Sequence, residues 1–455
     1  MVARVVIAGT ASGVGKTTLT VGLATALRRR GLRVAMFKCG PDYLDPGYHA
    51  RAAGAACHNL DGWMMGKDAV LATFAHAARG ADVALIEGVM GLFDGASPVS
   101  DDGSTAQIAK WLDAPVLLAC DASGMARSLA ALAQGFAGFD PDLRVAGVIC
   151  NRIGSDAHLQ LLRRALRQPP VLGGLTIHPE LAFPERHLGL RTAEPDALPD
   201  ALFDAWGEQV EAGVDVQAVL ELARSAPALP IAHECTAPAP AERCRIGVAM
   251  DEAFHFYYED NLRRLTQLGA RIVPFSPIHD AHLPEVDGLY LGGGYPELHA
   301  RALCANAAMR ADVASFAARG GPIYAECGGL MYLATSIHTI DGATHAMTGV
   351  VPARVQMHDR LQALGYVEVE TRAASVLGAP GLRFRGHQFR YSELELHGAI
   401  ETAYSVRKRR GGESFAEGYL QGNVLASYVH AHWASNPLVA EGLVDTCAAR
   451  AGARP

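Results

Sequence analysis

The sequence predicts an α/β protein of two tandem domains, each a mainly parallel sheet flanked by helices. Three observations predict this class. The length of 455 residues corresponds to two or three domains of ordinary size. Apolar strand-like runs alternate with helical patterns in both halves, as in parallel sheets covered by helices, and a proline-rich segment separates the halves. We therefore expect domains at 1–225 and 244–455, joined by a linker at 226–243.

The first half begins with five apolar runs, and helical patterns separate them. These predicted strands are Arg4–Gly9, Arg33–Lys38, Asp82–Gly88, Ala114–Cys120 and Arg144–Cys150. The alternation continues weakly through a helical pattern at 156–168 and a candidate strand at 171–177. The linker follows, with four prolines among alanines and little periodicity, which is typical of chain between domains.

The second half starts a new alternating series directly after the linker. Its apolar runs lie in Arg245–Asp251, Ala270–Pro277, Asp287–Glu297, Gly321–Ala334 and Asn423–Trp433. This series predicts a second sheet with helices on its faces.

Composition favours a soluble cytoplasmic protein. Half of the residues are hydrophobic, yet no charge-free apolar run reaches the 18 residues expected of a membrane span. The first ten residues lead straight into a phosphate loop, so we expect no targeting segment. Nine scattered cysteines without a C-x-x-C pair fit a reducing compartment. The net charge of −7 and dispersed basic residues give no reason to expect nucleic acid.

A glycine-rich loop follows the first predicted strand and precedes a helical pattern. This order lets backbone N–H groups face a phosphate. The spacing departs from the commonest phosphate-loop signature by one residue at its first glycine, Gly9, whereas Gly13-Val-Gly15-Lys16-Thr17 is intact. Lys16 would reach the β- and γ-phosphates and the Thr17 hydroxyl would bind Mg²⁺. The alternative is a plain glycine turn with a solvent-exposed lysine.

Acidic residues near two other strand ends suit the same site. Glu87 ends the run 82–87, where an acidic residue completes a Mg²⁺ site, and Asp94 lies one short loop further on. An acidic helix cap is the alternative for each. Asp42 and Asp45 lie on a proline-containing loop, where their carboxylates would handle metal, or attract and deprotonate ammonium, rather than bind an anionic group.

The second half carries a candidate nucleophile, Cys327, between an apolar strand and Gly328-Gly329. A tight strand-to-helix turn would expose the thiol, and the helix N-terminus would lower its pKa. A glycine turn at 292–294 could donate N–H groups to an oxyanion from Gly293 and Gly294. A third strand ends in His430 and His432, either of which could be the base.

These motifs carry a resemblance to known families. The first half resembles the dethiobiotin synthetase group, whose phosphate loop has the same residue pattern as Gly9 to Thr17 of this chain. Partitioning ATPases instead have lysine at the position of Ala11. The second half resembles class I glutamine amidotransferases of the cobyric acid and cobyrinate type. With 38–49, 86–95 and the cysteine and histidine motifs, the whole chain is similar to cobyrinate and hydrogenobyrinate a,c-diamide synthases.

The resemblance implies roles for particular residues. It makes Cys327 the glutaminase nucleophile and His430 its base, because the family pattern Tyr-x-His falls on 428–430. His432 stands where many class I enzymes have an orienting glutamate, and 386–392 departs from relatives at Gln388 and Arg390. Tyr43 and Leu44 would face the macrocycle. The residues expected to bind ATP are Thr10, Gly13, Gly15, Lys16, Thr17, Thr18 and Asn151; for Asn151, a plain strand-ending turn is equally favoured.

The implied reaction is ATP- and glutamine-dependent amidation of the a and c acetate carboxylates of a corrin through acyl phosphates, with Mg²⁺, in cobalamin biosynthesis. Two alternatives stay open: the same chemistry on another tetrapyrrole such as nickel sirohydrochlorin, and a nucleotide switch with a non-catalytic second domain. The expected partners are the corrin polycarboxylate and L-glutamine, with a homodimer as an option that the sequence leaves open.

Overall fold

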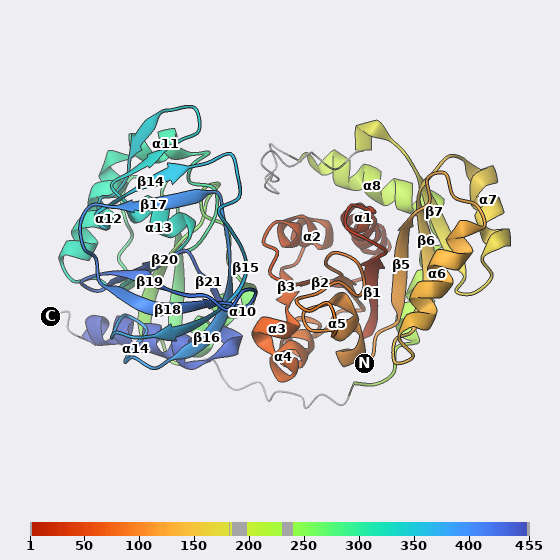
Figure 1. Ribbon diagram of the computed structural model, residues 1–455, viewed down its shortest axis with the longest axis horizontal. Coiled ribbons are helices and arrows are strands. Elements are labelled where there is room, and N and C mark those ends of the chain that lie inside the picture. Colours follow the sequence, from red (N-terminus) through yellow and green to blue (C-terminus); the bar gives the residue numbers. More distant parts are fainter. Residues whose placement is uncertain (1, 182, 184–197, 230–239, 453–455) are drawn as a thin grey trace. The chain divides into compact units, whose positions relative to one another are not determined.

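The structure, a computed structural model, describes residues 2–181, 183, 198–229 and 240–452. It divides into two compact units, Met1–Cys235 and Thr236–Pro455 (Figure 1). Part of the predicted linker, 230–239, lies outside the described residues. The two-domain α/β class predicted from the sequence is confirmed, and each unit is described by itself below.

The first unit is built on a seven-stranded sheet in the order β3-β2-β4-β1-β5-β6-β7, with every pairing parallel. Its strands are β1 (Ala3–Gly9), β2 (Val34–Cys39), β3 (Cys57–Leu60), β4 (Val83–Glu87), β5 (Val116–Asp121), β6 (Val145–Ile153) and β7 (Val171–Thr176). The centre of β1, residues 5–8, is fully buried, as expected of a strand covered by helices on both faces.

Helices connect these strands and cover the sheet (Figure 1). They are α1 (Lys16–Arg29), α2 (Asp45–Ala53), α3 (Gly62–Met65), α4 (Lys67–Ala77), α5 (Thr105–Trp111), α6 (Ser128–Phe139), α7 (Asp156–Ala165), η1 (Pro179–Leu181), α8 (Asp200–Gly213) and α9 (Val216–Arg224). Helix α1 packs against α8, and a Cβ at Gly22 would stand 2.7 Å from the carbonyl oxygen of Trp206. This close approach holds the phosphate-loop helix firmly in the unit.

The second unit contains a ten-stranded sheet in the order β21-β16-β15-β18-β19-β20-β11-β10-β8-β9. The strands are β8 (Cys244–Ala249), β9 (Ala270–Phe275), β10 (Gly288–Leu291), β11 (Ile323–Glu326), β15 (Ala363–Thr371), β16 (Arg383–Arg390), β18 (Thr402–Lys408), β19 (Ser414–Gln421), β20 (Val424–Ser427) and β21 (His430–His432). Strands β9, β8, β10, β11 and β20 pair in parallel, and the others antiparallel.

This sheet is therefore mixed, whereas we expected a mainly parallel one. The difference arises from 363–421, where short connections such as 409–413 between β18 and β19 permit only antiparallel pairing. A separate four-stranded sheet consists of β12 (Ser336–His338), β13 (Thr344–Ala346), β14 (Ala353–Met357) and β17 (Ser392–Leu396). The helices of the unit are α10 (Glu259–Gln267), α11 (Ala300–Ala305), α12 (Ala307–Ala318), α13 (Gly328–Leu333), η3 (Trp433–Ser435) and α14 (Leu438–Gly452).

Parallel pairing brings the candidate site residues to one edge of each sheet. In the first unit β1 lies between β4 and β5, so the phosphate loop begins beside the end of β4 at Glu87. In the second, β11 lies between β10 and β20, which places Cys327 between the strands that lead to the glycine loop and to His430. Among the described residues, no helix combines the length and hydrophobicity that crossing a membrane requires.

Candidate functional site

The phosphate loop is held in shape by its glycines and by the end of β6. Gly13 and Gly15 have φ of 76° and 93°, which glycine adopts without strain. A Cβ at Gly15 would stand 2.1 Å from Asn151 Nδ2, and this same amide donates to the Val14 carbonyl oxygen at 2.8 Å. Asn151, which we expected to bind ATP, hydrogen-bonds to the phosphate loop and supports its shape in this structure.

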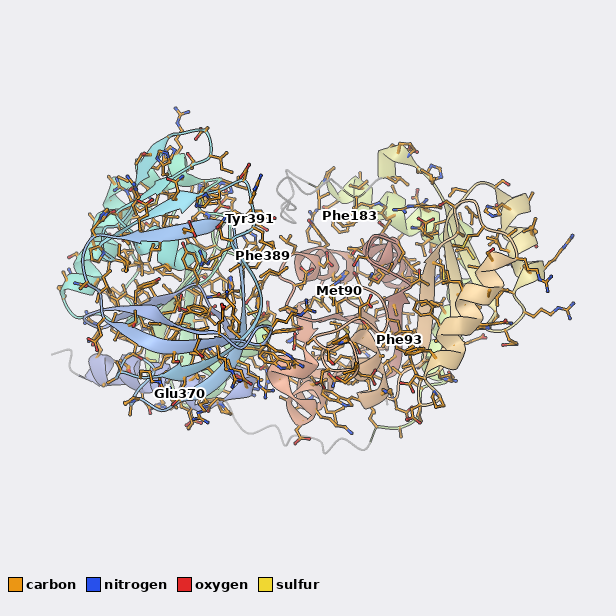
Figure 2. The ribbon with its side chains drawn as sticks, in the orientation of Figure 1. Met90, Phe93, Phe183, Glu370, Phe389 and Tyr391 are labelled. Carbon is orange, nitrogen blue, oxygen red and sulfur yellow. The ribbon has the colours of Figure 1, made fainter. Side chains whose placement is uncertain are left out.

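Lys16 begins α1 and is almost fully buried. Its Nζ donates to the carbonyl oxygens of Ala11 at 3.0 Å and Met90 at 2.6 Å. Figure 2 labels Met90, and also Phe93, in the same unit. Burial and the nearby Lys38 ammonium lower the pKa of Lys16. Two carbonyl oxygens are weak partners for a buried cation, so an arriving phosphate would be the stronger one.

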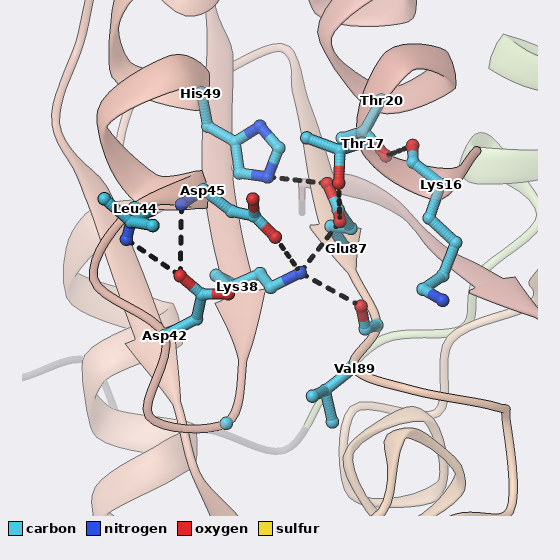
Figure 3. Close-up of polar contacts among 12 residues, drawn as sticks. Lys16, Thr17, Thr20, Lys38, Asp42, Leu44, Asp45, His49, Glu87 and Val89 are labelled. Atoms are coloured by element: carbon cyan, nitrogen blue, oxygen red, sulfur yellow. Dashed lines mark hydrogen bonds and ion pairs between the residues drawn. The ribbon is translucent and has the colours of Figure 1, made fainter. Parts of the chain in front are cut away.

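Glu87 lies at the centre of a buried ionic cluster, 0% exposed (Figure 3). Its Oε1 accepts from Thr17 Oγ1 at 2.8 Å and lies 2.8 Å from Lys38 Nζ. Its Oε2 lies 2.7 Å from His49 Nε2. Lys38 also lies 2.6 Å from Asp45 Oδ2. One lysine thus joins the end of β4 to the first turn of α2, and the helix-cap alternative for Glu87 is wrong.

Mutual charge compensation sets the ionisation of this cluster. Burial opposes a charge on Glu87, but Lys38 and His49 hold the pKa of the carboxyl well below its usual range. Burial likewise opposes a charge on Lys38, but Asp45 and Glu87 raise the pKa of its ammonium above its usual value. Burial and the neighbouring Asp42 raise the pKa of Asp45 to about 6, against the effect of Lys38.

The loop before α2 places the other predicted residues in different surroundings. Asp42 Oδ1 accepts from the backbone N–H groups of Leu44 at 2.8 Å and Asp45 at 3.1 Å, so it shapes the turn. Leu44 is only 5% exposed and belongs to the core, whereas Tyr43 is half-buried. Of this pair, which we expected to face the macrocycle, only Tyr43 has a partly exposed side chain.

The remaining predicted ATP and substrate residues surround the loop. Asp94 is exposed, and its Oδ2 accepts from the Gly91 N–H at 3.0 Å, which makes it a turn cap in this structure. Thr10 follows β1, and its N–H donates to the Ala119 carbonyl at 3.1 Å. Thr18 lies in the first turn of α1. The described residues contain no group of three or more His, Cys, Asp or Glu side chains arranged to hold a metal ion.

In the second unit Cys327 occupies a strained turn between β11 and α13. Its φ is 45° and its ψ −97°, a conformation that a non-glycine residue adopts only when its surroundings impose it. Its N–H donates to the Ser427 carbonyl at 2.7 Å. A Cβ at Gly329 would stand 2.2 Å from the Leu291 carbonyl oxygen. The glycines after the cysteine are therefore required by the close approach of neighbouring backbone.

The glycine loop after β10 packs against the nucleophile turn and the histidine. A Cβ at Gly328 would stand 3.0 Å from the Gly294 nitrogen, so that N–H lies beside the turn of Cys327. A Cβ at Gly293 would stand 2.5 Å from His430 Cε1. Any side chain at Gly293 would displace the imidazole, so the place of His430 depends on glycine at this position.

His430 and His432 have different environments on β21. The His430 ring stacks on that of His387, its cross-strand neighbour, with centroids 5.0 Å apart. His432 is buried, and its Nδ1 accepts from the Ala434 N–H at 3.3 Å. Of the two, His430 lies against the glycine loop, which supports the preference for it as the base.

Burial keeps Cys327 and His430, the candidate nucleophile and base, uncharged. Burial, reinforced by Glu297 and opposed by Arg390, raises the pKa of Cys327 to about 12. Burial lowers the pKa of His430 to about 3. The predicted lowering of the thiol pKa by the helix N-terminus is therefore wrong, because desolvation outweighs a helix of six residues. The thiol and the imidazole are both neutral in the free protein.

Sequence reasoning missed several polar residues of the two sites. They are Lys38, His49, Glu297, Glu326 and Glu417, and Arg390 was noted only as a departure from relatives. Lys38 was detectable, since a lysine inside a buried strand requires charged partners. Arg390 stacks over Tyr428 at 4.5 Å, close to Phe389, whose carbonyl lies 3.9 Å from Cys327 Sγ; Figure 2 labels Phe389 and Tyr391. The role of Arg390 depends on neighbours that are distant in the sequence.

We expect Lys38→Met to lower the free energy of unfolding by roughly 3–5 kcal/mol, because two buried carboxylates lose their shared cation. Lys110→Met is the matched control: Lys110 pairs with Asp101 and Asp140 near the surface, so its loss should cost at most about 1 kcal/mol. Urea unfolding followed by circular dichroism measures both. Equal losses would contradict the buried cluster described here.

The neutral thiol predicts slow alkylation of Cys327 in the absence of glutamine. Because the pKa of the thiol is about 12, the thiolate fraction grows roughly tenfold per pH unit below that value. The rate of iodoacetamide modification, followed by mass spectrometry of the Cys327 peptide, should rise continuously from pH 6 to pH 9. A plateau below pH 8 would instead indicate a thiolate–imidazolium pair.

Comparison with known proteins agrees with the geometry of both units. Residues 5–190 match the CobQ/CobB/MinD/ParA nucleotide binding domain, and residues 245–438 match the CobB/CobQ-like glutamine amidotransferase domain.

Similar proteins extend the match to nearly the whole chain. The cobyrinate a,c-diamide synthase of Leptospira interrogans is 53% identical over 448 residues, which cover 98% of each chain. Its counterparts from Syntrophotalea carbinolica and Salmonella typhimurium are 50% and 43% identical, covering 98% and 95% of each chain. Identity at this level along almost the full length shows that the chain belongs to the family of cobyrinate a,c-diamide synthases.

Proposed function

We propose that the two units divide the glutamine-hydrolysing synthesis of cobyrinate a,c-diamide between them. The first unit activates each carboxylate with ATP, and the second releases ammonia from glutamine. The observation that carries this division is the strained Cys327 turn with Gly293 and His430 around it, because nothing in ATP-dependent activation requires a thiol.

Activation of the carboxylate is proposed to occur at the phosphate loop. A carboxylate oxygen of the corrin attacks the γ-phosphorus of ATP, and ADP leaves with the bond electrons to give an acyl phosphate. Lys16 would exchange its carbonyl partners for the β- and γ-phosphates. Ammonia then attacks the acyl carbon, and inorganic phosphate and a proton are released to leave the amide. The cycle repeats for the second acetate.

The residues at the loop fit a magnesium ion. Thr17 Oγ1 and Glu87 Oε1, 2.8 Å apart, are oxygen ligands of the kind Mg²⁺ prefers, and Mg²⁺ usually takes only one or two protein ligands besides phosphates and water. Bound there, the ion would neutralise charge on the phosphates. Lys38 and His49 would hold Glu87 in place, and Asp45, restrained by Lys38, would lie where the acceptor enters.

Release of ammonia is proposed to follow a thioester route. His430 takes the Cys327 proton as sulfur attacks the glutamine amide carbon, while the Gly293 and Gly294 N–H groups stabilise the oxyanion. The amide nitrogen then leaves as ammonia with the proton from His430, and water hydrolyses the thioester to glutamate. Because both groups are neutral beforehand, this proton transfer would accompany attack rather than precede it.

Other expectations stand as part of the proposal. The described cysteines form no disulfide bonds, in keeping with a reducing cytoplasm, the compartment that also supplies ATP and glutamine. A homodimer stays a prediction for light scattering to test. The nucleotide-switch alternative has no support, since the diamide synthases cover nearly the whole chain. The same coverage disfavours a different tetrapyrrole.

The first test separates the nitrogen sources. We expect Cys327→Ala to lose glutamine-dependent synthesis and to retain synthesis with high ammonium chloride at raised pH, where more nitrogen is NH₃. Mass spectrometry of the amidated corrin measures both. Cys304→Ala, at a partly exposed thiol on α11, is the control and should retain both activities. Loss of both activities in folded Cys327→Ala would refute the division.

The second test concerns activation. We expect Lys16→Ala to abolish amidation from glutamine and from ammonia alike, by roughly 100-fold or more, because one phosphate site serves both carboxylates and both nitrogen sources. Glutamine hydrolysis at the second unit should continue in the variant. Amidation at an undiminished rate would show that the phosphate loop is not the activating site.

A further inference from the structure

Glu326 is a buried carboxyl group with no assigned role, directly before Cys327 at the end of β11. It is 0% exposed, and among the described residues no cationic side chain pairs with it. Its Oε1 accepts from the Tyr324 hydroxyl at 2.8 Å, and its Oε2 from the Tyr290 hydroxyl at 3.1 Å. Burial of an unpaired carboxyl is costly, so its retention here requires a reason.

The third partner of Glu326 belongs to the histidine strand. The Ala431 N–H donates to Glu326 Oε1 at 3.0 Å, and Ala431 stands between His430 and His432. Strand β21 has only three residues and lies at the edge of the sheet, paired to β16 alone. On its unpaired side a carboxyl group therefore replaces the neighbouring strand as hydrogen-bond acceptor.

A second side chain completes this arrangement. Asn261 Nδ2 donates to the Ala431 carbonyl at 2.8 Å, and its Oδ1 accepts from the Trp433 N–H at 2.9 Å. Peptide groups on both sides of His432 are thus fixed by side chains. The hydrogen bond between Ala431 and Glu326 connects β21 to the residue that precedes Cys327.

The imidazole of His430 is closely packed by its neighbours. It lies against Gly293, where a Cβ would stand 2.5 Å from Cε1, and it stacks on His387. A displacement of about 1 Å in a catalytic group can cost about two orders of magnitude in rate. A hydrogen bond that fixes the backbone one residue from His430 would therefore affect proton transfer from Cys327.

We propose that Glu326 is a positioning residue of the glutaminase, whose carboxyl oxygen holds the Ala431 N–H and thereby fixes His430 relative to Cys327. The inference rests on the proposed function of the second unit. Many class I enzymes align the histidine with a glutamate that contacts its ring from the position of His432. Glu326 would provide the same alignment through a backbone hydrogen bond.

Reach and charge can be separated at this position. Glu326→Gln keeps an oxygen that can accept from Ala431, and its NH₂ group can donate to a tyrosine hydroxyl, which can also accept. Glu326→Asp keeps the ionisable group but shortens the side chain by one methylene, which withdraws it from Ala431. If the hydrogen bond to Ala431 positions His430, Glu326→Asp should hydrolyse glutamine more slowly than Glu326→Gln.

The experiment measures glutamine hydrolysis and ammonia-dependent synthesis in the full-length enzyme. We expect Glu326→Gln to keep kcat for glutamine within about threefold and Glu326→Asp to lose roughly 100-fold. The KM for glutamine should change less than about threefold in both, which shows that the site is folded and binds substrate. Synthesis from ammonia should be unchanged.

Asp287→Asn is the matched control. Asp287 is a buried carboxylate immediately before β10, at the other end of the sheet, and accepts from the Arg245 N–H at 2.8 Å. Its variant should keep kcat. An unimpaired Glu326→Asp, a Glu326→Gln as slow as Glu326→Asp, or an equal loss in Asp287→Asn would each overturn the proposal. Failure here leaves the Cys327→Ala result intact, so the two hypotheses fail separately.

Discussion

The cost of burying charge governs both units of this protein. In the first, Glu87 is fully enclosed, and the fold compensates it with Lys38 and His49 from β2 and α2. Since Lys38 also binds Asp45, this compensation determines where the loop at 38–45 runs. The position of the phosphate loop relative to that segment follows from a single shared carboxylate, because Thr17 donates to Glu87 too. Removing any one of these charged side chains leaves the remaining buried charges without compensation.

In the second unit, two buried carboxyl groups meet the same constraint mainly through neutral hydrogen-bond donors. Glu326 is held by two tyrosine hydroxyls and a backbone N–H, and Glu417 accepts from Ser427 Oγ and the Tyr428 N–H, both at 2.5 Å. Both carboxyl groups bind the segment 427–431. Burial raises the pKa of Glu326 to about 7, against these hydrogen bonds. The segment that delivers the histidine is thus supported by side chains where a short edge strand lacks neighbours.

The sequence predicted the features that are local in the chain. The phosphate loop, the cysteine turn and the parallel strands follow from spacing and periodicity, since glycine, lysine and apolar runs act within a few residues. The buried clusters could not be derived in this way, because Lys38, His49 and Glu87 meet only after β2 and β4 pair. The antiparallel strands at 363–421 were missed for lack of strong alternation with helices. The thiol pKa was predicted in the wrong direction because burial depends on the complete fold.

The neutral pair of Cys327 and His430 has a consequence for the durability of the enzyme. Peroxides oxidise thiolates much faster than thiols, and each oxidation step beyond the sulfenic acid is difficult to reverse. A thiol with a pKa of about 12, only 7% exposed, presents almost no thiolate to such oxidants. The burial that keeps the thiol neutral therefore also protects the sulfur from chemical damage.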